Sequence, residues 1–509
     1  MNDSSATTQA TPLPLGEDAR RAGEGRDAPS WITQRDAARP LIRPVGTFSR
    51  KGRRVLVGAL ICFAAFCSAA SAKETLVKNV AEFDAAVKAA KAGDEIVMAD
   101  GEWRDVDLHM RGHKVGGWFI ILRAQTPGKV VLTGTSRLRI SGYSATVRGL
   151  LWKDSAAVDD VISFRLDSKN LAHKCHLEDC AILGDMPGTE RKWVSLYGTD
   201  NFVTNCRFEG KRSGGTLFVV WLDDEPASQG GHFISENFFG PRERLGKNGG
   251  EIVRVGDSKT SLITASCTIT DNYFYRCSGE AEIISNKSCG NSYGGNMFVG
   301  CGGALTLRHG NRCSVYTNYF FGDGQKGIGG VRVIGENHSV FMNVFHGLTG
   351  DDTRAALSLM NGLVDSPANG YFQVRGAQIR FNDFIDCKES IVIGNADKDQ
   401  KQQTLPPLDC NFVGNRVAAG DRPVFVVRTE PLNFTGENNR YAADSLGCAG
   451  APGWTPIARE ELTSQQVLVA TEHRKPLLPS ETGPEWMRPG DEFLPEALKP
   501  AKKTDATPK

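Results

Sequence analysis

An Asn-x-Phe triplet that recurs through the middle of the chain is the feature that most limits how this sequence can fold. Successive triplets are 35, 24, 22, 25 and 39 residues apart and begin at Asn237, Asn272, Asn296, Asn318, Asn343 and Asn382. The segments between them, such as CSVYTNYF and HSVFMNVF, are short, β-branched and punctuated by glycine, which is typical of strands. Three short strands and three turns per repeat predict one coil of a parallel β-helix, with residues one period apart about 4.8 Å from each other.

The triplets themselves are assigned to structure rather than to chemistry. Phe is expected to fill the interior of each coil, and Asn is expected to satisfy backbone groups in a stacked turn. The longer intervals of 35 and 39 residues predict coils that carry an inserted loop. Insertions on one side of a solenoid commonly form the walls of a binding groove.

Both ends of the repeat can be predicted. Phe83, Val87 and Ala90 have helical spacing, and Gly93-Asp94 follows them, so a short N-terminal helix is expected to cap the solenoid. The repeat is lost beyond about residue 450, where the chain becomes rich in Pro, Glu and Lys. We therefore expect an all-β chain with one right-handed parallel β-helix over residues 73–450, followed by an extended, partly disordered tail over residues 451–509.

The first 72 residues predict export. Residues 1–49 form a polar extension, and residues 50–72 contain RKGRR, the apolar run VLVGALICFAAFC and a small-residue cleavage site at Ala70–Ala72. This order is typical of a secretory signal peptide, and the apolar run is too short to span a bilayer comfortably. Either a later start codon or removal of the extension with the signal would explain its position. The mature chain is expected to begin at Lys73, to be periplasmic or secreted, and to have no stable membrane insertion.

Net charge and cysteine content limit which ligands, disulfides and metal sites this chain can have. With 60 Lys and Arg against 59 Asp and Glu, the net charge of +1 gives no global field that favours nucleic acid, so any recognition of a polyanion must be local. Two of the 13 cysteines lie in the predicted signal, which leaves 11, and an odd number excludes a complete disulfide framework. Several follow the period of the repeat, which predicts stacked, buried free thiols: Cys267, Cys277, Cys289, Cys301 and Cys313. No CxxC pair supports a zinc site.

Charged and amide side chains share one phase of the repeat. Eight of them lie 8 to 15 residues after a triplet: Asn248, Glu251, Glu280, Glu282, Lys287, Arg308, Arg332 and Arg354. The three arginines are 24 and 22 residues apart and would form a basic ladder suited to a linear acidic polymer. Glu280 and Glu282 would share one face of a strand, and with the Asn248 amide they offer the hard oxygen ligands that Ca²⁺ takes. A solvated surface or a set of salt bridges is the alternative for the same residues.

Several motifs in fixed order resemble the polysaccharide lyase family of alginate lyases and chondroitinase B. From about Val77 to Gly362 they are AGDEIVMADGEW, LRAQTPGKVVLTG, NGGEIVRVG, GEAEIISNKS, LTLRHGN and GGVRVIGENH. The resemblance implies a right-handed parallel β-helix and a Ca²⁺-assisted β-elimination that leaves 4,5-unsaturated uronate ends. It also implies roles for five residues, with Lys287 as the base, Arg308 as its partner, and three Ca²⁺ ligands: Asn248, Glu280 and Glu282.

The chemistry of such a reaction accounts for these residue types. The C5 proton of a uronate is hard to remove beside a carboxylate, and a divalent cation on that carboxylate neutralises it. The cation and Arg308 would also disfavour the charged form of Lys287, as a base requires. A guanidinium does not readily give up a proton, so Arg308 is expected to stabilise charge at the leaving O4 while water delivers the proton. Four further residues are expected to contact the substrate: Arg332, Arg354, His309 and His338.

Other functions stay open at this point. Hydrolysis would need an acid and a base around the bond; Asp223-Asp224 and Asp351-Asp352 are available pairs, but nothing places a matching acid near Lys287. A non-catalytic glycan-binding solenoid would keep the basic ladder, and the intact Lys287 and Arg308 argue against it. Among substrates, alginate is preferred to dermatan sulfate because it is the commoner activity in the family, although the groove arginines could serve either.

Overall fold

The computed structural model describes residues 72–113, 119–188, 190–222, 230–397, 402–449, 451–462 and 475–499. The chain divides into two compact units, Met1–Ser68 and Ala69–Lys509, and the described residues belong to the second. The polar extension over residues 1–49 and the predicted signal peptide up to Ser71 lie outside the described residues. No helix within the described ranges is long and apolar enough to cross a membrane.

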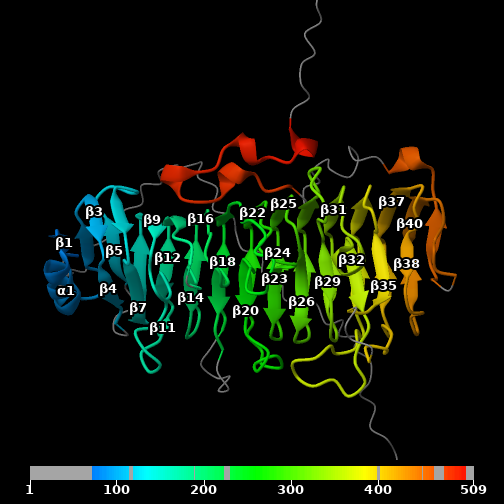
Figure 1. Ribbon diagram of the computed structural model, residues 1–509, viewed down its shortest axis with the longest axis horizontal. Coiled ribbons are helices and arrows are strands. Elements are labelled where there is room, and N and C mark those ends of the chain that lie inside the picture. Colours follow the sequence, from blue (N-terminus) through cyan, green and yellow to red (C-terminus); the bar gives the residue numbers. More distant parts are fainter. Residues whose placement is uncertain are drawn as a thin grey trace, which may run out of the picture. The chain divides into compact units, whose positions relative to one another are not determined.

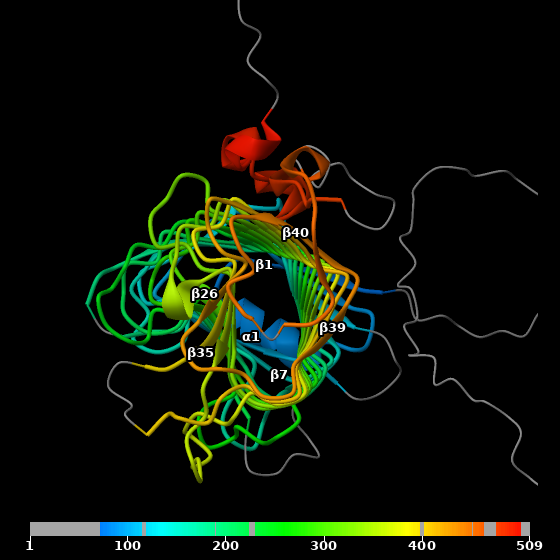
Figure 2. The same cartoon turned by 90° about the vertical axis from the view of Figure 1, so that its right-hand side faces the viewer.

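Three parallel sheets make up the described chain (Figures 1 and 2). Sheet I has the order β1 (Glu74–Val77), β2 (Glu95–Met98), β5 (Ile120–Ala124), β8 (Ala145–Arg148), β12 (His176–Glu178), β15 (Phe202–Thr204), β18 (Phe233–Ser235), β21 (Thr268–Thr270), β24 (Ser292–Gly294), β27 (Ser314–Tyr316), β30 (Ser339–Phe341), β33 (Gln378–Arg380), β36 (Asn411–Val413) and β39 (Thr435–Glu437). Sheet II has the order β11 (Ala172–His173), β7 (Arg137–Tyr143), β10 (Ile162–Ser163), β14 (Val194–Leu196), β17 (Phe218–Val220), β20 (Val253–Val255), β23 (Glu282–Lys287), β26 (Ala304–His309), β29 (Val331–Val333), β32 (Leu357–Met360), β35 (Ile391–Asn395) and β38 (Phe425–Val427), with β4 (Asp107–Arg111) paired to β7. Sheet III has the order β3 (Gly101–Arg104), β6 (Val130–Thr133), β9 (Leu150–Ser155), β13 (Ala181–Asp185), β16 (Arg207–Glu209), β19 (Phe238–Phe239), β22 (Tyr273–Tyr275), β25 (Met297–Val299), β28 (Tyr319–Phe321), β31 (Val344–His346), β34 (Asp383–Ile385), β37 (Arg416–Gly420), β40 (Asn439–Ala443) and β41 (Trp454–Pro456).

Each strand pairs mainly with the equivalent strand of the coil before and the coil after. The prediction of an all-β parallel β-helix is therefore confirmed. Figure 2 shows the three sheets as the walls of a tube, with the helix α1 (Val80–Ala89) at its far end. The Asn79 side chain caps α1 by accepting the Glu82 N–H at 2.9 Å, and Phe83 is fully buried. The predicted capping helix is confirmed.

The Asn-x-Phe triplets form two stacks inside the tube. In the asparagine stack, Asn318 Oδ1 accepts both the N–H and the Nδ2–H of Asn296, each at 2.9 Å, and the same pattern runs from Asn237 to Asn439. In the phenylalanine stack, neighbouring rings lie 4.6 to 4.9 Å apart, from Phe239 through Phe384. The triplet thus satisfies buried turn backbone and fills the core, as predicted.

The part of the C-terminal tail that the structure describes lies along sheet III (Figure 1). It consists largely of short 3-10 turns, preceded in the chain by η3 (Arg459–Glu461): η4 (Pro479–Glu481), η5 (Glu485–Met487), η6 (Asp491–Phe493) and η7 (Glu496–Leu498). Arg207 donates to the Met487 carbonyl at 3.2 Å, and the Tyr273 hydroxyl donates to the Phe493 carbonyl at 2.7 Å. The disorder expected at the chain end falls on residues 500–509, outside the described residues. All 11 described cysteines are free thiols and buried.

Candidate functional site

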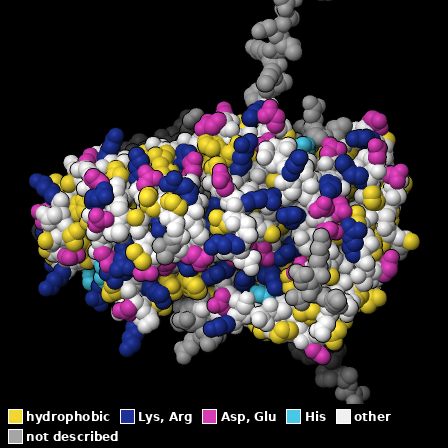
Figure 3. Space-filling model, in the orientation of Figure 1, with side chains coloured by type: hydrophobic (Ala, Val, Ile, Leu, Met, Phe, Trp, Pro, Cys, Tyr) yellow, Lys and Arg dark blue, Asp and Glu magenta, His cyan; other side chains and the backbone are white. Residues whose placement is uncertain are grey.

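The outer face of sheet II carries the predicted site. Along it, Arg254, Ser285, Thr306 and Arg332 are register partners on β20, β23, β26 and β29. Small hydroxyl residues therefore form the floor between two arginines. Lys and Arg side chains gather across the middle of this face (Figure 3). The basic ladder expected from Arg308, Arg332 and Arg354 does not form in register, because Arg332 pairs with Thr306 and Ser358 and Arg354 lies in a turn before β32. Arg254 belongs to this row instead, and the phase count did not single it out because its spacing falls in the coil with the first insertion.

Lys287 and Arg308 lie at the carboxyl ends of neighbouring strands. Lys287 ends β23 and is the register partner of His309, because a bulge in the pairing passes over Arg308. The Lys287 side chain has no hydrogen bond or ion pair with another described residue. Arg308 Nη1 contacts His309 Nδ1 at 3.3 Å. The structure therefore brings together the two residues that the sequence predicted as base and partner.

His309 is set behind Arg308 rather than in the open groove. Its side chain belongs to a residue only 2% exposed, and its Nε2 lies 3.4 Å from Ser258 Oγ. Burial, helped by the charges of Arg308 and Lys287, lowers the pKa of His309 to about 3. A guanidinium can only donate, so His309 Nδ1 accepts from Arg308 and Nε2 carries the proton. The neutral imidazole thus orients Arg308.

The second insertion supplies a wall beside Arg308. Arg308 Nη1 donates to the Gly370 carbonyl at 2.9 Å, and its guanidinium lies 4.0 Å from the centre of the Tyr371 ring. The Tyr371 hydroxyl in turn donates to Asp397. Burial raises the pKa of Tyr371 to about 12, so the hydroxyl keeps its proton. Sequence reasoning missed Tyr371, although the 39-residue interval indicated an insertion at this point.

Two carboxylates lie at or just before the start of β23, opposite the end that carries Lys287. Glu282 begins β23, and its Oε1 accepts from Arg332 Nη2 at 2.5 Å, in a pair that is only 10% and 12% exposed. Glu280 Oε2 accepts the N–H groups of Gly249 and Gly250 at 2.7 and 2.9 Å. Arg332, predicted to contact substrate, is therefore also the ion-pair partner of a predicted metal ligand.

Asn248 lies on the first insertion, beside Glu280. It is exposed and lines a pocket of about 240 Å³ with Glu280, Arg244 and Arg354. Arg354 belongs to the 3-10 turn η2 (Asp352–Arg354), which is part of the second insertion. Both predicted insertions thus contribute side chains to the site.

The donor set fits a hard cation. Burial and the like charges of Glu251 and Glu282 raise the pKa of Glu280 to about 7. Carboxylate and amide oxygens are the ligands that Ca²⁺ prefers. Within the described chain no cluster of three or more His, Cys, Asp or Glu side chains is arranged to hold a metal, and the set here is instead two carboxylates and one amide.

A buried arginine fixes the turn that carries Asn248. Arg242 is 2% exposed, and its two terminal nitrogens donate to four backbone carbonyls at 2.8 to 3.3 Å: those of Ser213, Gly215, Gly250 and Glu251. Arg242 thereby ties the turn at Gly249 and Gly250, which binds Glu280, to the preceding coil. Sequence reasoning missed Arg242, since nothing in its spacing distinguishes a buried arginine from a surface one.

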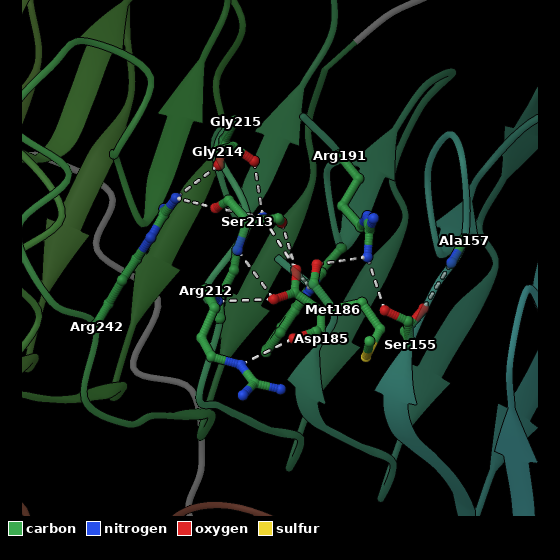
Figure 4. Close-up of polar contacts among 12 residues, drawn as sticks. Ser155, Ala157, Asp185, Met186, Arg191, Arg212, Ser213, Gly214, Gly215 and Arg242 are labelled. Atoms are coloured by element: carbon green, nitrogen blue, oxygen red, sulfur yellow. Dashed lines mark hydrogen bonds and ion pairs between the residues drawn. The ribbon is translucent and has the colours of Figure 1, made fainter. Parts of the chain in front are cut away.

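The preceding coil is itself stabilised by a buried carboxylate and a buried ammonium group. Asp185 accepts the backbone N–H groups of Arg212 and Ser213 at 2.7 and 3.0 Å, and its second oxygen accepts from the Ser213 hydroxyl (Figure 4). The Lys211 ammonium lies 3.5 Å from the same carboxylate, with both side chains fully buried. Burial lowers the pKa of Lys211 to about 7. The cluster links the coils beneath the candidate site.

His338 is not part of this site. It is fully buried, its Nδ1 accepts the Cys313 N–H at 3.1 Å, and its Nε2 lies 3.0 Å from the Ile334 carbonyl. The equivalent place two coils earlier is held by Asn291, which accepts the Cys267 N–H at 2.8 Å. His338 therefore substitutes for an asparagine in a second turn ladder, and the expected contact with substrate does not fit this position.

Of the acidic pairs considered for hydrolysis, Asp351-Asp352 is engaged in ion pairs. Asp351 pairs with Lys388 at 2.5 Å, and Asp352 pairs with Arg428 at 2.8 Å. Asp223-Asp224 lie outside the described residues.

Comparisons with known proteins agree with this fold and identify the family. A family model described as chondroitinase B matches residues 77–413. The solved structure of the family 6 alginate lyase AlyGC is similar, with 33% identity, a TM-score of 0.76 and coverage of 81% of this chain but 59% of that one. A mannuronic acid specific family 6 lyase from human gut microbiota has 26% identity, a TM-score of 0.67 and coverage of 82% and 97%. A family 6 polysaccharide lyase from Pseudopedobacter saltans has 25% identity, a TM-score of 0.65 and coverage of 81% and 99%. The search of curated proteins gave no match.

Proposed function

This chain belongs to the chondroitinase B family, and from that premise we propose that it is a polysaccharide lyase that cleaves alginate by β-elimination. The observation that carries the proposal is the position of Lys287, which lies without an ionic partner among the described residues and next to Arg308 on the basic face of sheet II. An amine that must accept a proton from substrate needs such a free position. The proposed place of action is outside the cytoplasm.

The proposed reaction uses the side chains of this face in distinct ways. The neutral Lys287 amine accepts the C5 proton of a uronate, the C4–O4 bond breaks with its electron pair on O4, and a C4=C5 double bond forms. Water gives O4 its proton. Arg308, oriented by the Gly370 carbonyl and by His309, stabilises the negative charge that develops on O4.

We propose that Ca²⁺ is the resident cation and that Asn248, Glu280 and Glu282 hold it. When bound, it would neutralise the substrate carboxylate and so make the C5 proton more acidic. Arg332 would keep Glu282 in place through their ion pair. Gly249 and Gly250 would do the same for Glu280 through their N–H groups.

Alginate is favoured over dermatan sulfate by the relatives. AlyGC is an alginate lyase, and the gut relative acts on mannuronic acid. The matching family model carries the name of chondroitinase B, so a dermatan sulfate lyase is the second candidate.

An absorbance assay for the unsaturated uronate tests both candidates. The purified protein is given alginate or dermatan sulfate, each with added calcium and with a chelator. A calcium-dependent rise on alginate is expected. A rise on dermatan sulfate alone would change the assigned substrate but support the β-elimination. An undiminished rate in the presence of chelator would contradict the Ca²⁺ assignment.

A further inference from the structure

A second, larger pocket opens on the same face of sheet II, toward the N-terminal coils. It has a volume of about 650 Å³, lies over β7, β10, β14 and β17, and includes Arg165, Lys192, Tyr197 and Trp221 in its lining. None of the residues assigned above to base, partner or cation lines it.

The register places this pocket in line with Lys287. Tyr197 and Trp221 directly follow Leu196 and Val220, which are partners on β14 and β17. Val220 continues through Val255 to Asn286, the residue before Lys287. Trp221 and Tyr197 therefore occupy the same place in the coil as Lys287, two and three coils earlier, or about 10 and 14 Å along the solenoid.

Three cations lie against these rings, one of them the Lys192 ammonium, which is 5.8 Å from the centre of the Trp221 ring. The Arg165 guanidinium lies 3.8 Å from the centre of the Tyr197 ring. The Tyr197 and Trp221 rings are parallel within 10°, with centres 6.0 Å apart. The Arg254 guanidinium lies 5.1 Å from the centre of the Trp221 ring. The row therefore runs guanidinium, ring, ring, guanidinium, and the rings hold both arginines extended.

The acidic residues near this row do not neutralise all of its cations. Arg137 pairs with Asp107 and Asp159, and Glu190 pairs with Lys247. Asp160 faces Lys192 and Arg165, with its pKa raised by burial. Among the described residues, Arg165, Lys192 and Arg254 form no ion pair. These cations can therefore take an anionic ligand.

We propose that this row, from Arg165 to Arg254, is a subsite for carboxylates of the same polyuronate chain, one to four sugar residues from the bond that is cleaved. The inference rests on the proposed function. A pyranosyl residue of an extended chain is comparable in length to one coil, so a chain lying on sheet II would bring its carboxylates to the row. Guanidinium groups bind carboxylates in bidentate fashion, and those already held by stacking lose little freedom on binding. The subsite makes the enzyme prefer long chains to short ones.

The test compares chain lengths. We expect Arg165→Ala to lower kcat/KM on polymeric alginate about fivefold to tenfold, mainly through KM, as for the loss of one charged contact. The same variant should leave kcat/KM unchanged on the shortest oligosaccharide that the unaltered enzyme cleaves, since that substrate does not reach Arg165 at the far end of the row. Trp221→Ala should behave alike, and Trp221→Phe should restore most of the loss because it keeps a stacking ring. Arg380→Ala removes an exposed arginine from sheet I and is the matched control.

Equal losses on long and short substrates would overturn the subsite, as would no loss on either. A binding measurement separates this outcome from failure of the proposed function. Retardation of Lys287→Ala in a gel that contains alginate should weaken when Arg165→Ala is added. If the unaltered protein cleaves no uronate polymer, the lyase proposal fails; the gel then decides the subsite alone, and unchanged retardation refutes it.

Discussion

Among single residues, the proposed reaction depends on one amine and on the groups that surround it. Lys287 is positioned by a strand end and by a bulge, whereas Arg308 is positioned by contacts from three places: His309, Gly370 and Tyr371. The sequence motifs indicated Lys287 and Arg308. They could not indicate Tyr371, because its contact depends on how an inserted loop folds back over the sheet.

Replacing the proposed base tests its role. Lys287→Gln should lower kcat about a thousandfold with little change in KM, since the amide keeps the shape but cannot accept the proton. Initial rates on alginate measure this. Lys153→Gln, at an exposed site on sheet III, should leave the rate unchanged. A Lys287→Gln enzyme with half the normal rate would contradict the assignment.

Arg242 should affect the cation without touching it. Lysine cannot make all four hydrogen bonds that the Arg242 guanidinium donates to backbone carbonyls, so Arg242→Lys should make the turn at Asn248 less rigid. We therefore expect the calcium concentration for half-maximal activity to rise about tenfold or more. Rates at saturating calcium should recover largely. A loss that calcium does not restore would show that Arg242 serves only the stability of the fold.

At the scale of elements, stacked turns are what make the coils repeat. The triplets predicted the asparagine and phenylalanine stacks because every coil repeats the same three letters. The second ladder was hidden, since Asn201, His232, Asn291 and His338 share its places and differ in residue type. The number of residues after a triplet gives a position around the coil only to within several residues. For this reason the sequence placed His338 in the groove.

His338 should make stability depend on pH. Burial lowers its pKa to about 4, below the ordinary value of 6.5, so the unfolded chain binds a proton more readily than the folded one. This residue's contribution is complete above pH 6.5 and is lost as the pH falls toward 4, in total about 3 kcal/mol. His338→Asn should flatten the dependence of Tm on pH in this range. A Tm profile parallel to that of the unaltered protein would contradict it.

The asparagine stack should be costly to interrupt. Asn318→Ala leaves the Asn296 N–H without its acceptor in the core, and we expect the free energy of unfolding to fall by about 2–3 kcal/mol. Urea unfolding measures the change. Asn170→Ala, at an exposed turn, should shift the midpoint little.

Across the whole described chain, sheets II and III have different roles. Sheet II carries the candidate site, while residues 475–499 pack on part of sheet III, including β16 and β22. Composition predicted that the tail leaves the repeat, but its docking could not be predicted, because it depends on contacts with strands more than 200 residues away, such as Tyr273 with Phe493.

Removing residues 475–509 should lower the stability of the protein but leave its catalytic rate close to normal. Sheet III residues such as Tyr273 and Phe238 would become exposed, so Tm should fall by about 5 °C or more and a hydrophobic dye should bind. The value of kcat at 25 °C should stay close to normal, since sheet II is untouched. Loss of kcat in a chain that remains folded would contradict this division.

The ratio of new double bonds to new reducing ends during digestion of alginate distinguishes β-elimination from hydrolysis. β-Elimination makes one 4,5-unsaturated uronate for each reducing end, so we expect a ratio of one from the start of the reaction, and neither product with Lys287→Ala. Reducing ends that appear without double bonds would mean hydrolysis and would contradict the proposed β-elimination.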